Sequence, residues 1–252
     1  MELLIEQVQL DRIDLFYVLV CGLIAGLCRG FAGFGLSALI VTSMTLVLLP
    51  KEVVPIALLL EMLSSLVMAR MTWSAIHWSL LRWLLVGAAI GVPLGVLLLK
   101  FVPADPLRII ISIAVLTASL VLFFGRHFRL KESTPKNLSV GLISGVANGA
   151  ASLGGLPVAI YMMAAALPAE AVRATLNLYF LFLDAYGTGA LFFAGLVDQV
   201  TLARSVLLIV PVIFGIYVGN KIFQRSSATH YRYVVLTLLM ALSISGLVKS
   251  FI

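Results

Sequence analysis

The sequence has 252 residues, of which 62% are hydrophobic and only 11% are charged. Soluble globular domains average about 45–50% apolar and about 25% charged residues, so this composition excludes a water-soluble enzyme and indicates an integral membrane protein. The formal net charge of +6 does not indicate a nucleic-acid-binding protein, because Lys and Arg fall in short clusters between apolar segments, as they do beside membrane spans.

In chain order, an acidic N-terminal tail over residues 1–14 comes first. It lacks the basic start and the small-residue cleavage site of a secretory signal, so we expect no removable signal here. Charge-poor segments follow, most of them close in length to the ~20 apolar residues of one membrane-spanning helix, which predicts an all-α polytopic membrane protein. These segments are 16–49, 53–69, 83–99, 109–125, 138–167, 174–197, 205–220 and 233–248.

Two of these segments are too long for one crossing and too short for two. Segments 16–49 and 138–167 contain 34 and 30 residues. As continuous helices they would run about 51 and about 45 Å at 1.5 Å per residue, against a hydrocarbon core of about 30 Å. We therefore expect an interruption in each of them.

Each long segment carries a glycine-rich stretch, at residues 30–35 and 149–155. Glycine at this density destabilises a helix and permits left-handed backbone. Unwound backbone is tolerated in a bilayer where protein or water satisfies its polar groups. We predict that each segment is two short helices that meet at an unwound tip. The alternative is tight helix packing, which is the role expected for glycines spaced four apart, such as Gly22 and Gly26.

The two long segments look like copies of one another. A shift of 119 residues places Gly22 on Gly141 and Gly30 on Gly149. The sequence therefore predicts a tandem duplication of about four helical segments per repeat. The first repeat covers 15–126, a basic linker covers 127–136, and the second repeat covers 137–252. Such repeats are typical of secondary transporters, with the substrate near the midplane where broken helices meet.

The orientation depends on whether the long segments cross the bilayer. If each is a re-entrant hairpin, the repeats are inverted, and ten Lys and Arg residues share one face against six on the other. If each crosses once, the split is nine to seven. Because positive residues concentrate on the cytoplasmic side, we expect inverted repeats with both termini outside.

These features resemble the TauE/SafE sulfite exporter family of bacterial membrane permeases. The resemblance covers about residues 15–250 and lies in the duplicated glycine-rich segments, which end in Leu-Pro-x-Glu at 49–52 and 167–170. It implies an exporter of small sulfur-containing anions, such as sulfite or organosulfonates, in the bacterial inner membrane. The first tip, Arg29-Gly-Phe-Ala-Gly-Phe-Gly, is bulkier than the plain glycine runs associated with the family.

Arg29 is the only charged residue within 16–49 and lies at the predicted break. A charge at the bilayer centre costs about 2.5–3.5 kcal/mol on insertion scales, so it should face water or have a partner. One interpretation is an anion ligand, because a guanidinium fork and half-helix N–H groups suit oxyanions. The others are a place near the membrane surface, or a structural lock with Glu61 or Asp184.

Asn148 corresponds to Arg29 in the second repeat. Its side chain could donate to an oxyanion, or it could donate to unwound backbone carbonyls. Asn177 and Thr188 make the span that contains Asp184 the most polar one, as expected of a helix that lines a pathway or packs through polar contacts. The candidate substrate-binding residues are Arg29, Gly30, Gly33, Gly35, Asn148, Gly149, Ser152, Gly154 and Asn177.

Glu61 and Asp184 are the acidic residues within predicted spans. A carboxylate in a low-dielectric site favours its neutral form and could bind and release a proton near neutral pH. Both are therefore candidate proton-coupling residues. The alternative is charge pairing with Arg29 or Arg173.

The function predicted from the sequence is secondary transport, most simply export, of a small anion. An anion channel is the alternative. A membrane-embedded enzyme is less favoured, because GxSxG and HExxH motifs are not present. We accordingly predict no catalytic residues, no bound metal and no cofactor. The expected partners are a small anionic substrate and the lipid bilayer, without nucleic acid, and a homo-oligomer is compatible with the sequence.

Overall fold

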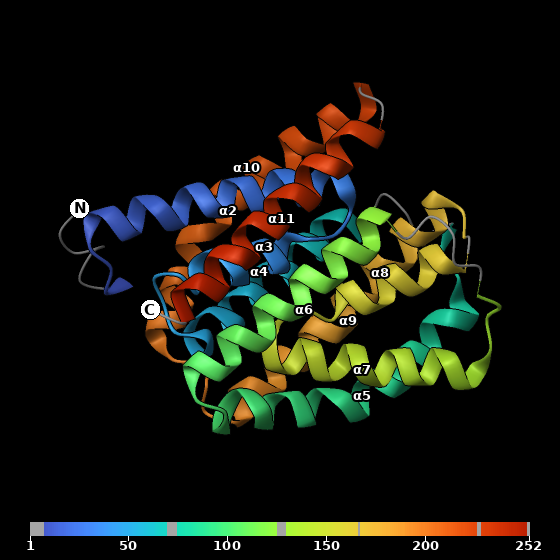
Figure 1. Cartoon of the computed structure of the whole chain (residues 1–252), viewed down its shortest axis with the longest axis horizontal. Coiled ribbons are helices and arrows are strands. Elements are labelled where there is room, and N and C mark those ends of the chain that lie inside the picture. Colours follow the sequence, from blue (N-terminus) through green and yellow to red (C-terminus); the bar gives the residue numbers. More distant parts are fainter. Residues whose placement is uncertain (1–7, 70–74, 125–129, 166, 226–227, 251–252) are drawn as a thin grey trace.

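The fold was analysed in a computed structural model that describes residues 8–69, 75–124, 130–165, 167–225 and 228–250 (Figure 1). Within these residues the chain forms ten helices and no strand. They are α2 (Arg12–Ala32), α3 (Leu36–Met44), α4 (Pro50–Ala69), α5 (Trp78–Phe101), α6 (Ala104–Phe124), α7 (Thr134–Ala151), α8 (Gly155–Ala164), α9 (Ala169–Phe193), α10 (Gln199–Arg225) and α11 (Ala228–Ser250).

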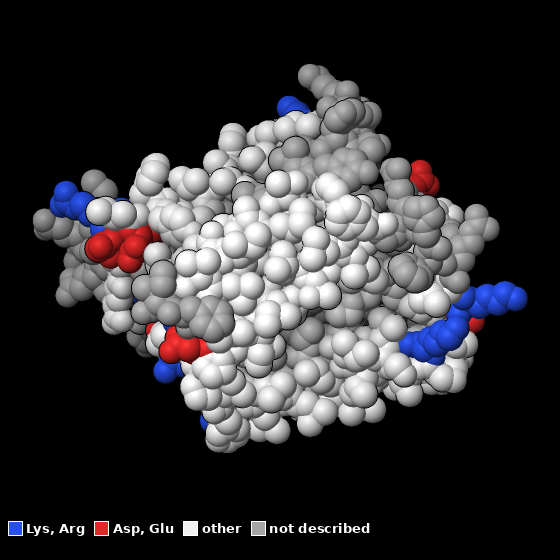
Figure 2. All heavy atoms as spheres, viewed as in Figure 1, with Lys and Arg blue, Asp and Glu red and all other residues white. Residues whose placement is uncertain are grey.

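Five helices are long and apolar enough to cross a membrane, among the residues that the structure describes. The predicted class, an all-α polytopic membrane protein, is therefore confirmed. Figure 2 shows the same property on one face, where charged side chains lie at the edges and none lies in the white centre. The candidate spans are Arg12–Phe31, Trp78–Phe101, Ala104–Phe124, Glu170–Phe193 and Gln199–Ile222.

Both long segments are broken at the predicted tips. Gly33 caps α2 with φ 78°, and Gly35 precedes α3 with φ 96°, in the left-handed region that glycine enters without steric cost. In the second segment the break follows α7 at Ser152, which has φ 55°, and α8 begins at Gly155. Each tip thus reverses the chain within a few residues.

The prediction of two short helices is wrong for the first half of each segment. Helix α2 has 21 residues and α7 has 18, and both continue through Gly30 and Gly149 respectively. A Cβ atom at Gly30 would lie 2.2 Å from the carbonyl oxygen of Ile216, and one at Gly149 would lie 2.3 Å from that of Val92. These two glycines therefore serve close helix packing, which offsets their low helix propensity.

The glycine contacts also give the directions of the helices. Along α2, Gly26 lies against Val212 and Gly30 against Ile216, so α2 and α10 run parallel. Along α5, Gly91 lies beside Gly145 and the later Gly95 beside Gly149, so α5 and α7 run parallel as well. Small residues at these positions let the helix backbones approach closely.

Helix α9 runs in the same direction as α5. The backbone N–H of His77, before α5, donates to Thr175 at 2.9 Å, whereas Lys100 near the end of α5 donates to the carbonyl of Ala194 at 3.1 Å. Helix α4 runs the opposite way, because Asn177 contacts Ser65 while the later Gly187 lies beside the earlier Leu58.

Helices α4 and α2 run in the same direction, and both lie beside α10. Contacts at matching ends show this: the start of α4 pairs with the start of α10 through Glu52 and Arg204, and Glu61 farther along pairs with Arg29 at the end of α2. Helix α2 therefore runs opposite to α7, its predicted equivalent. The duplication and its boundaries remain a prediction, and residues 1–7 of the tail and 127–129 of the linker lie outside the described residues.

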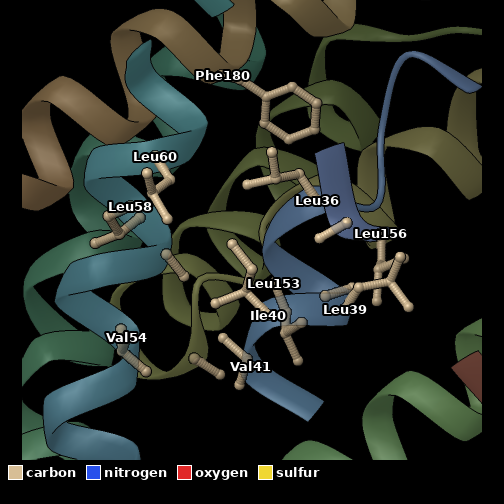
Figure 3. Packing of buried hydrophobic residues seen from close by; sticks show 14 of the residues in the cluster. Leu36, Leu39, Ile40, Val41, Val54, Leu58, Leu60, Leu153, Leu156 and Phe180 are labelled. Carbon is tan, nitrogen blue, oxygen red and sulfur yellow. The ribbon is translucent and has the colours of Figure 1, made fainter. Parts of the chain in front are cut away.

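Helix α3 folds back beside α2 in the interior. The Tyr17 hydroxyl near the start of α2 donates to the carbonyl of Ser43 at the end of α3, at 3.0 Å. With nine residues, all buried, α3 reaches only about 13 Å. Figure 3 shows its apolar side chains, among them Leu36 and Ile40, packed between α4 and the second tip. Surrounding protein thus satisfies the condition for unwound backbone at membrane depth.

We expect residue 131 to be cytoplasmic and residue 5 to be outside. The charge distribution predicts this orientation, and Lys131 is exposed in the structure. Single cysteines at positions 5 and 131, in a background that lacks Cys21 and Cys28, would be labelled with a membrane-impermeant maleimide on intact cells. Labelling only at position 5 is expected, and labelling at 131 before lysis would show the opposite orientation.

Candidate functional site

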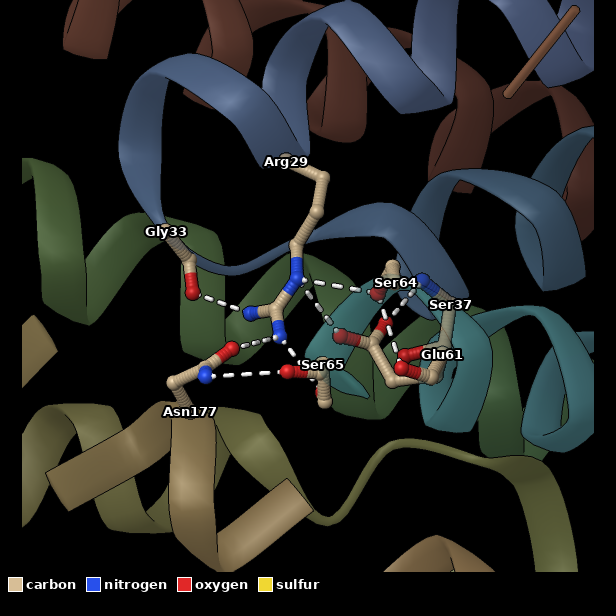
Figure 4. A network of polar contacts seen from close by, with 7 residues as sticks. All are labelled: Arg29, Gly33, Ser37, Glu61, Ser64, Ser65 and Asn177. Atoms are coloured by element: carbon tan, nitrogen blue, oxygen red, sulfur yellow. Dashed lines mark hydrogen bonds and ion pairs between the residues drawn. The ribbon is translucent and has the colours of Figure 1, made fainter. Parts of the chain in front are cut away.

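Arg29 lies at the end of α2, next to the first tip, and its side chain is 0% exposed. Its Nε lies 3.0 Å from Oε1 of Glu61, which α4 contributes and which is 1% exposed. The two form a fully buried ion pair (Figure 4). Of the alternatives that the sequence leaves for Arg29, the structure therefore shows the pairing with Glu61.

Neutral acceptors satisfy the remaining guanidinium donors. Nη2 donates to Ser65 Oγ at 2.8 Å and to Asn177 Oδ1 at 3.1 Å, and Nη1 donates to the carbonyl oxygen of Gly33. Nε also approaches Ser64 Oγ, at 3.3 Å. The unwound carbonyl at the first tip is thus satisfied by the same arginine, and α9 is joined to α4 through Asn177.

An aromatic ring covers one face of the guanidinium. The Phe180 ring of α9 lies 4.7 Å from the Arg29 Cζ, a distance at which a cation is attracted to the ring. A Cβ atom at Gly155 would lie 2.2 Å from the same ring, so Phe180 separates the first tip from the start of α8. The bare backbone of Gly155 is therefore required for this ring to fit.

Glu61 is also bound to the beginning of α3. Its Oε2 accepts from the backbone N–H of Ser37 at 3.0 Å. A carboxylate at a helix N-terminus is stabilised by the unpaired N–H groups and by the helix dipole. The positive end of the half-helix, which the sequence analysis assigns to an anion, is occupied by a side chain of the protein itself.

The second tip is held by Asn148 and Ser144. Asn148 of α7 donates to Asp184 Oδ1 of α9 at 2.9 Å and accepts from the N–H of Gly154 at 3.3 Å. The carbonyl of Gly154 accepts from Ser144 Oγ at 2.5 Å, and Ser144 also contacts the Tyr179 hydroxyl. Asn148 thus bonds an unwound backbone N–H rather than a carbonyl, and its role toward an oxyanion stays a prediction.

Three buried oxygens near this tip have no hydrogen-bond partner among the described residues. They are Oδ2 of Asp184, Oγ of Ser152 and Oγ1 of Thr188. Asp184 is 0% exposed and Ser152 is 1% exposed. Burying a polar group without a partner is unfavourable. At the first tip Oε1 of Glu61 also lacks a hydrogen bond, but it lies 3.0 Å from the Arg29 Nε, whereas no cationic side chain pairs with Asp184 among the described residues.

The structure thus divides the predicted site residues into three groups. Arg29, Gly33, Asn177 and Glu61 meet at the first tip, and Asn148, Gly154 and Asp184 meet at the second. Gly30 and Gly149 pack against α10 and α5 instead, and Gly35 contributes backbone conformation, with nothing within 4 Å of an added Cβ.

Several residues of the first tip are not predicted from the sequence. Ser64 and Ser65 bind Arg29, and Phe180 covers it. A signal for the serines was present, because they follow Glu61 by three and four residues and so share its helix face. Phe180 carried no such signal, since it lies on another helix and resembles any apolar span residue.

A cavity of about 320 Å³ opens at the end of the bundle where α4 and α10 begin. Lys51, Glu52 and Arg204 are among its lining residues. Arg204 pairs with Glu52 at 2.7 Å and also contacts a small apolar cavity deeper in the protein. This ion pair therefore separates the outer cavity from the interior at that end.

The geometry of a buried arginine between broken helices suits a membrane transporter, and comparison with known proteins agrees. A family model described as sulfite exporter TauE/SafE matches residues 18–246. The chain belongs to the TauE/SafE sulfite exporter family. The resemblance found from the sequence is thereby confirmed, as are the membrane transporter class and the multi-pass membrane localisation. Neither the curated proteins nor the solved structures give a match.

Proposed function

We propose that this TauE/SafE protein is a secondary transporter that exports a small anion, most simply sulfite or an organosulfonate. The observation that carries this proposal is the fully buried Arg29–Glu61 pair at the tip of a broken helix. Substrate sites of secondary transporters are typically formed by such interrupted helices near the midplane. Family membership supports transport itself, and the chemistry of the pair supports an anion as the substrate.

Glu61 occupies two positions that the oxyanion of a substrate would take. One of its oxygens is on the Arg29 guanidinium, and the other is on the N–H of Ser37 at the start of α3. A sulfite or sulfonate group carries oxygens with the same ability to accept from both donors. We therefore propose that the substrate replaces Glu61, with Ser65 and Asn177 close enough to contact it.

The burial of the pair favours a transporter over an open channel. Arg29 is 0% exposed and is covered by Phe180, so an anion reaches it only after side chains or helices move. Alternating exposure of one site to the two sides of the membrane is the mechanism expected of broken-helix transporters. Glu61 would close the site each time the anion leaves.

We expect counterflow in proteoliposomes to identify the substrate. Purified full-length protein would be loaded with unlabelled sulfite, sulfate, a sulfonate or a carboxylate and supplied with the labelled form outside. Uptake above that of protein-free liposomes is expected for sulfite or a sulfonate, because their oxyanions suit Arg29. Uptake of carboxylates alone, or of none of these anions, would contradict the proposed substrate class.

A further inference from the structure

The two broken helices differ in charge at equivalent places. At the end of α2, Arg29 supplies a positive charge that meets the carboxylate of Glu61 at 3.0 Å. At the end of α7, the residue aligned with Arg29 is the neutral Asn148, and it meets the carboxylate of Asp184 at 2.9 Å. Among the described residues, no cationic side chain forms an ion pair with Asp184.

Helix directions bring further oxygens to this carboxylate. Helices α7 and α9 both run parallel to α5, so they are parallel to one another. The contact between Asn148 and Asp184 fixes their register. Thr188 follows Asp184 by one helical turn on α9 and shares its face, and Ser152 is the left-handed residue that caps the end of α7, four residues after Asn148. Because the two helices are parallel, the polar surface that begins at the Asn148–Asp184 contact extends toward Ser152 and Thr188.

The oxygens of this cluster can serve as ligands of a positively charged partner. Oδ2 of Asp184, Oγ of Ser152 and Oγ1 of Thr188 have no hydrogen-bond partner in the part of the chain that the structure describes. They lie where α7 ends, and the C-terminal end of a helix carries a partial negative charge. Half-helix C-termini and unwound carbonyls are recurrent ligands of coupling cations in secondary transporters.

We propose that Asp184, Thr188 and Ser152 bind a sodium ion that is coupled to the movement of the anion. The coupling half of this proposal rests on the proposed function, whereas sodium binding itself does not. The sodium ion supplies at the end of α7 the charge that Arg29 supplies at the end of α2. One carboxylate with two hydroxyls suits a monovalent ion better than calcium or magnesium, which take more oxygen ligands or keep several waters.

A sodium site at Asp184 replaces the prediction that Asp184 couples protons. A bound proton would give Asp184 a single O–H donor, which can reach one of the hydroxyl oxygens of Ser152 and Thr188 but not both, whereas a cation can contact all three oxygens. Glu61 of α4 and Arg29 of α2 act electrostatically on Asp184 from neighbouring helices, and they are already paired with one another. Their charges largely cancel, so they do not replace a cation at Asp184.

The test measures sodium binding without any anionic substrate. Thermal unfolding of the purified full-length protein would be followed in NaCl and in choline chloride at equal ionic strength and constant pH. Sodium is expected to raise the unfolding midpoint in a saturable manner, because a ligand that binds only the folded state stabilises it. Asp184→Asn is expected to abolish this shift.

Two further variants make the test specific. Thr188→Val keeps the shape of the side chain and removes one ligand, so we expect the sodium affinity to fall about tenfold while the protein still folds. Ser205→Ala is the matched control, because Ser205 is buried on α10 and its hydroxyl, among the described residues, bonds the carbonyl of Thr201 on its own helix. It is expected to keep the sodium affinity of the unchanged protein.

Equal unfolding midpoints in the two salts would overturn the proposal, and so would a sodium shift that persists in Asp184→Asn. Loss of pH-driven anion flux in Asp184→Asn, without any sodium effect, would show a proton at this carboxylate and would equally overturn it. Because sodium binding is measured without anion, it can succeed when the counterflow experiment fails. The two proposals are therefore distinguishable.

Discussion

Replacing Arg29 by Gln is expected to abolish anion binding in protein that still folds. Gln retains a hydrogen-bond donor but loses the charge and the planar fork that match an oxyanion. The same change leaves Glu61 buried without its partner, and breaking a buried pair in this way typically costs about 3–5 kcal/mol. Anion binding would be measured on the purified protein by isothermal titration calorimetry with the substrate found in counterflow.

Glu61→Gln separates the binding role of Arg29 from its structural role. If Glu61 occupies the position of the substrate, this variant is expected to bind the anion more tightly than the unchanged protein, because the competing carboxylate is gone. The double variant Arg29→Gln with Glu61→Gln should recover much of the stability lost in Arg29→Gln, since both buried charges are removed, but it should not bind anion.

Glu52→Gln is the matched control for this series. Glu52 also pairs with an arginine, Arg204, but at the end of the bundle, where it is 33% exposed. It is expected to leave anion affinity unchanged. Its cost in stability should stay below that of Arg29→Gln, because Arg204, which is 7% exposed, also donates to the carbonyl oxygen of Val8 and the glutamine of the variant would retain an acceptor oxygen. Unchanged anion affinity in Arg29→Gln would show that Arg29 only locks the tip, and weaker binding in Glu61→Gln would exclude the exchange of carboxylate for substrate.

Alanine at Gly30 or Gly149 is expected to lower stability strongly without removing a ligand of the anion. Each added methyl group would lie 2.2 or 2.3 Å from a backbone carbonyl oxygen of the neighbouring helix, which has no flexible end that could move away. The helices must then separate, and overpacking of this kind costs about 1–3 kcal/mol or more. The unfolding midpoint in detergent is the measurement.

Gly189→Ala provides the control within a span. Gly189 lies inside α9 with nothing within 4 Å of the added Cβ. The stability of the variant should therefore be unchanged or rise by up to about 1 kcal/mol, because alanine has the higher helix propensity. A Gly30→Ala or Gly149→Ala protein with the original midpoint and no anion binding would restore the substrate-binding role that the sequence analysis assigned to these glycines.

Much of the candidate site could be predicted from the sequence, because its residues are of types that are rare in the segments around them. Arg29, Glu61 and Asp184 are charges in apolar segments, where each charge has a cost and therefore needs a reason. Gly33 and Gly35 belong to a stretch with more glycine than a helix tolerates, and both adopt positive φ. Their positions could be predicted, whereas their partners could not.

The sequence by itself determined the membrane class, the family, the two breaks and the buried charges, because composition, segment length and glycine density are local properties. Only the tertiary structure decided that Arg29 pairs with Glu61, which lies on another helix, and that no arginine in the described part of the chain pairs with Asp184. It also decided that Gly30 and Gly149 serve packing. Each of these outcomes depends on which helices are neighbours and in which direction they run, and residue spacing along one helix carries no information on either.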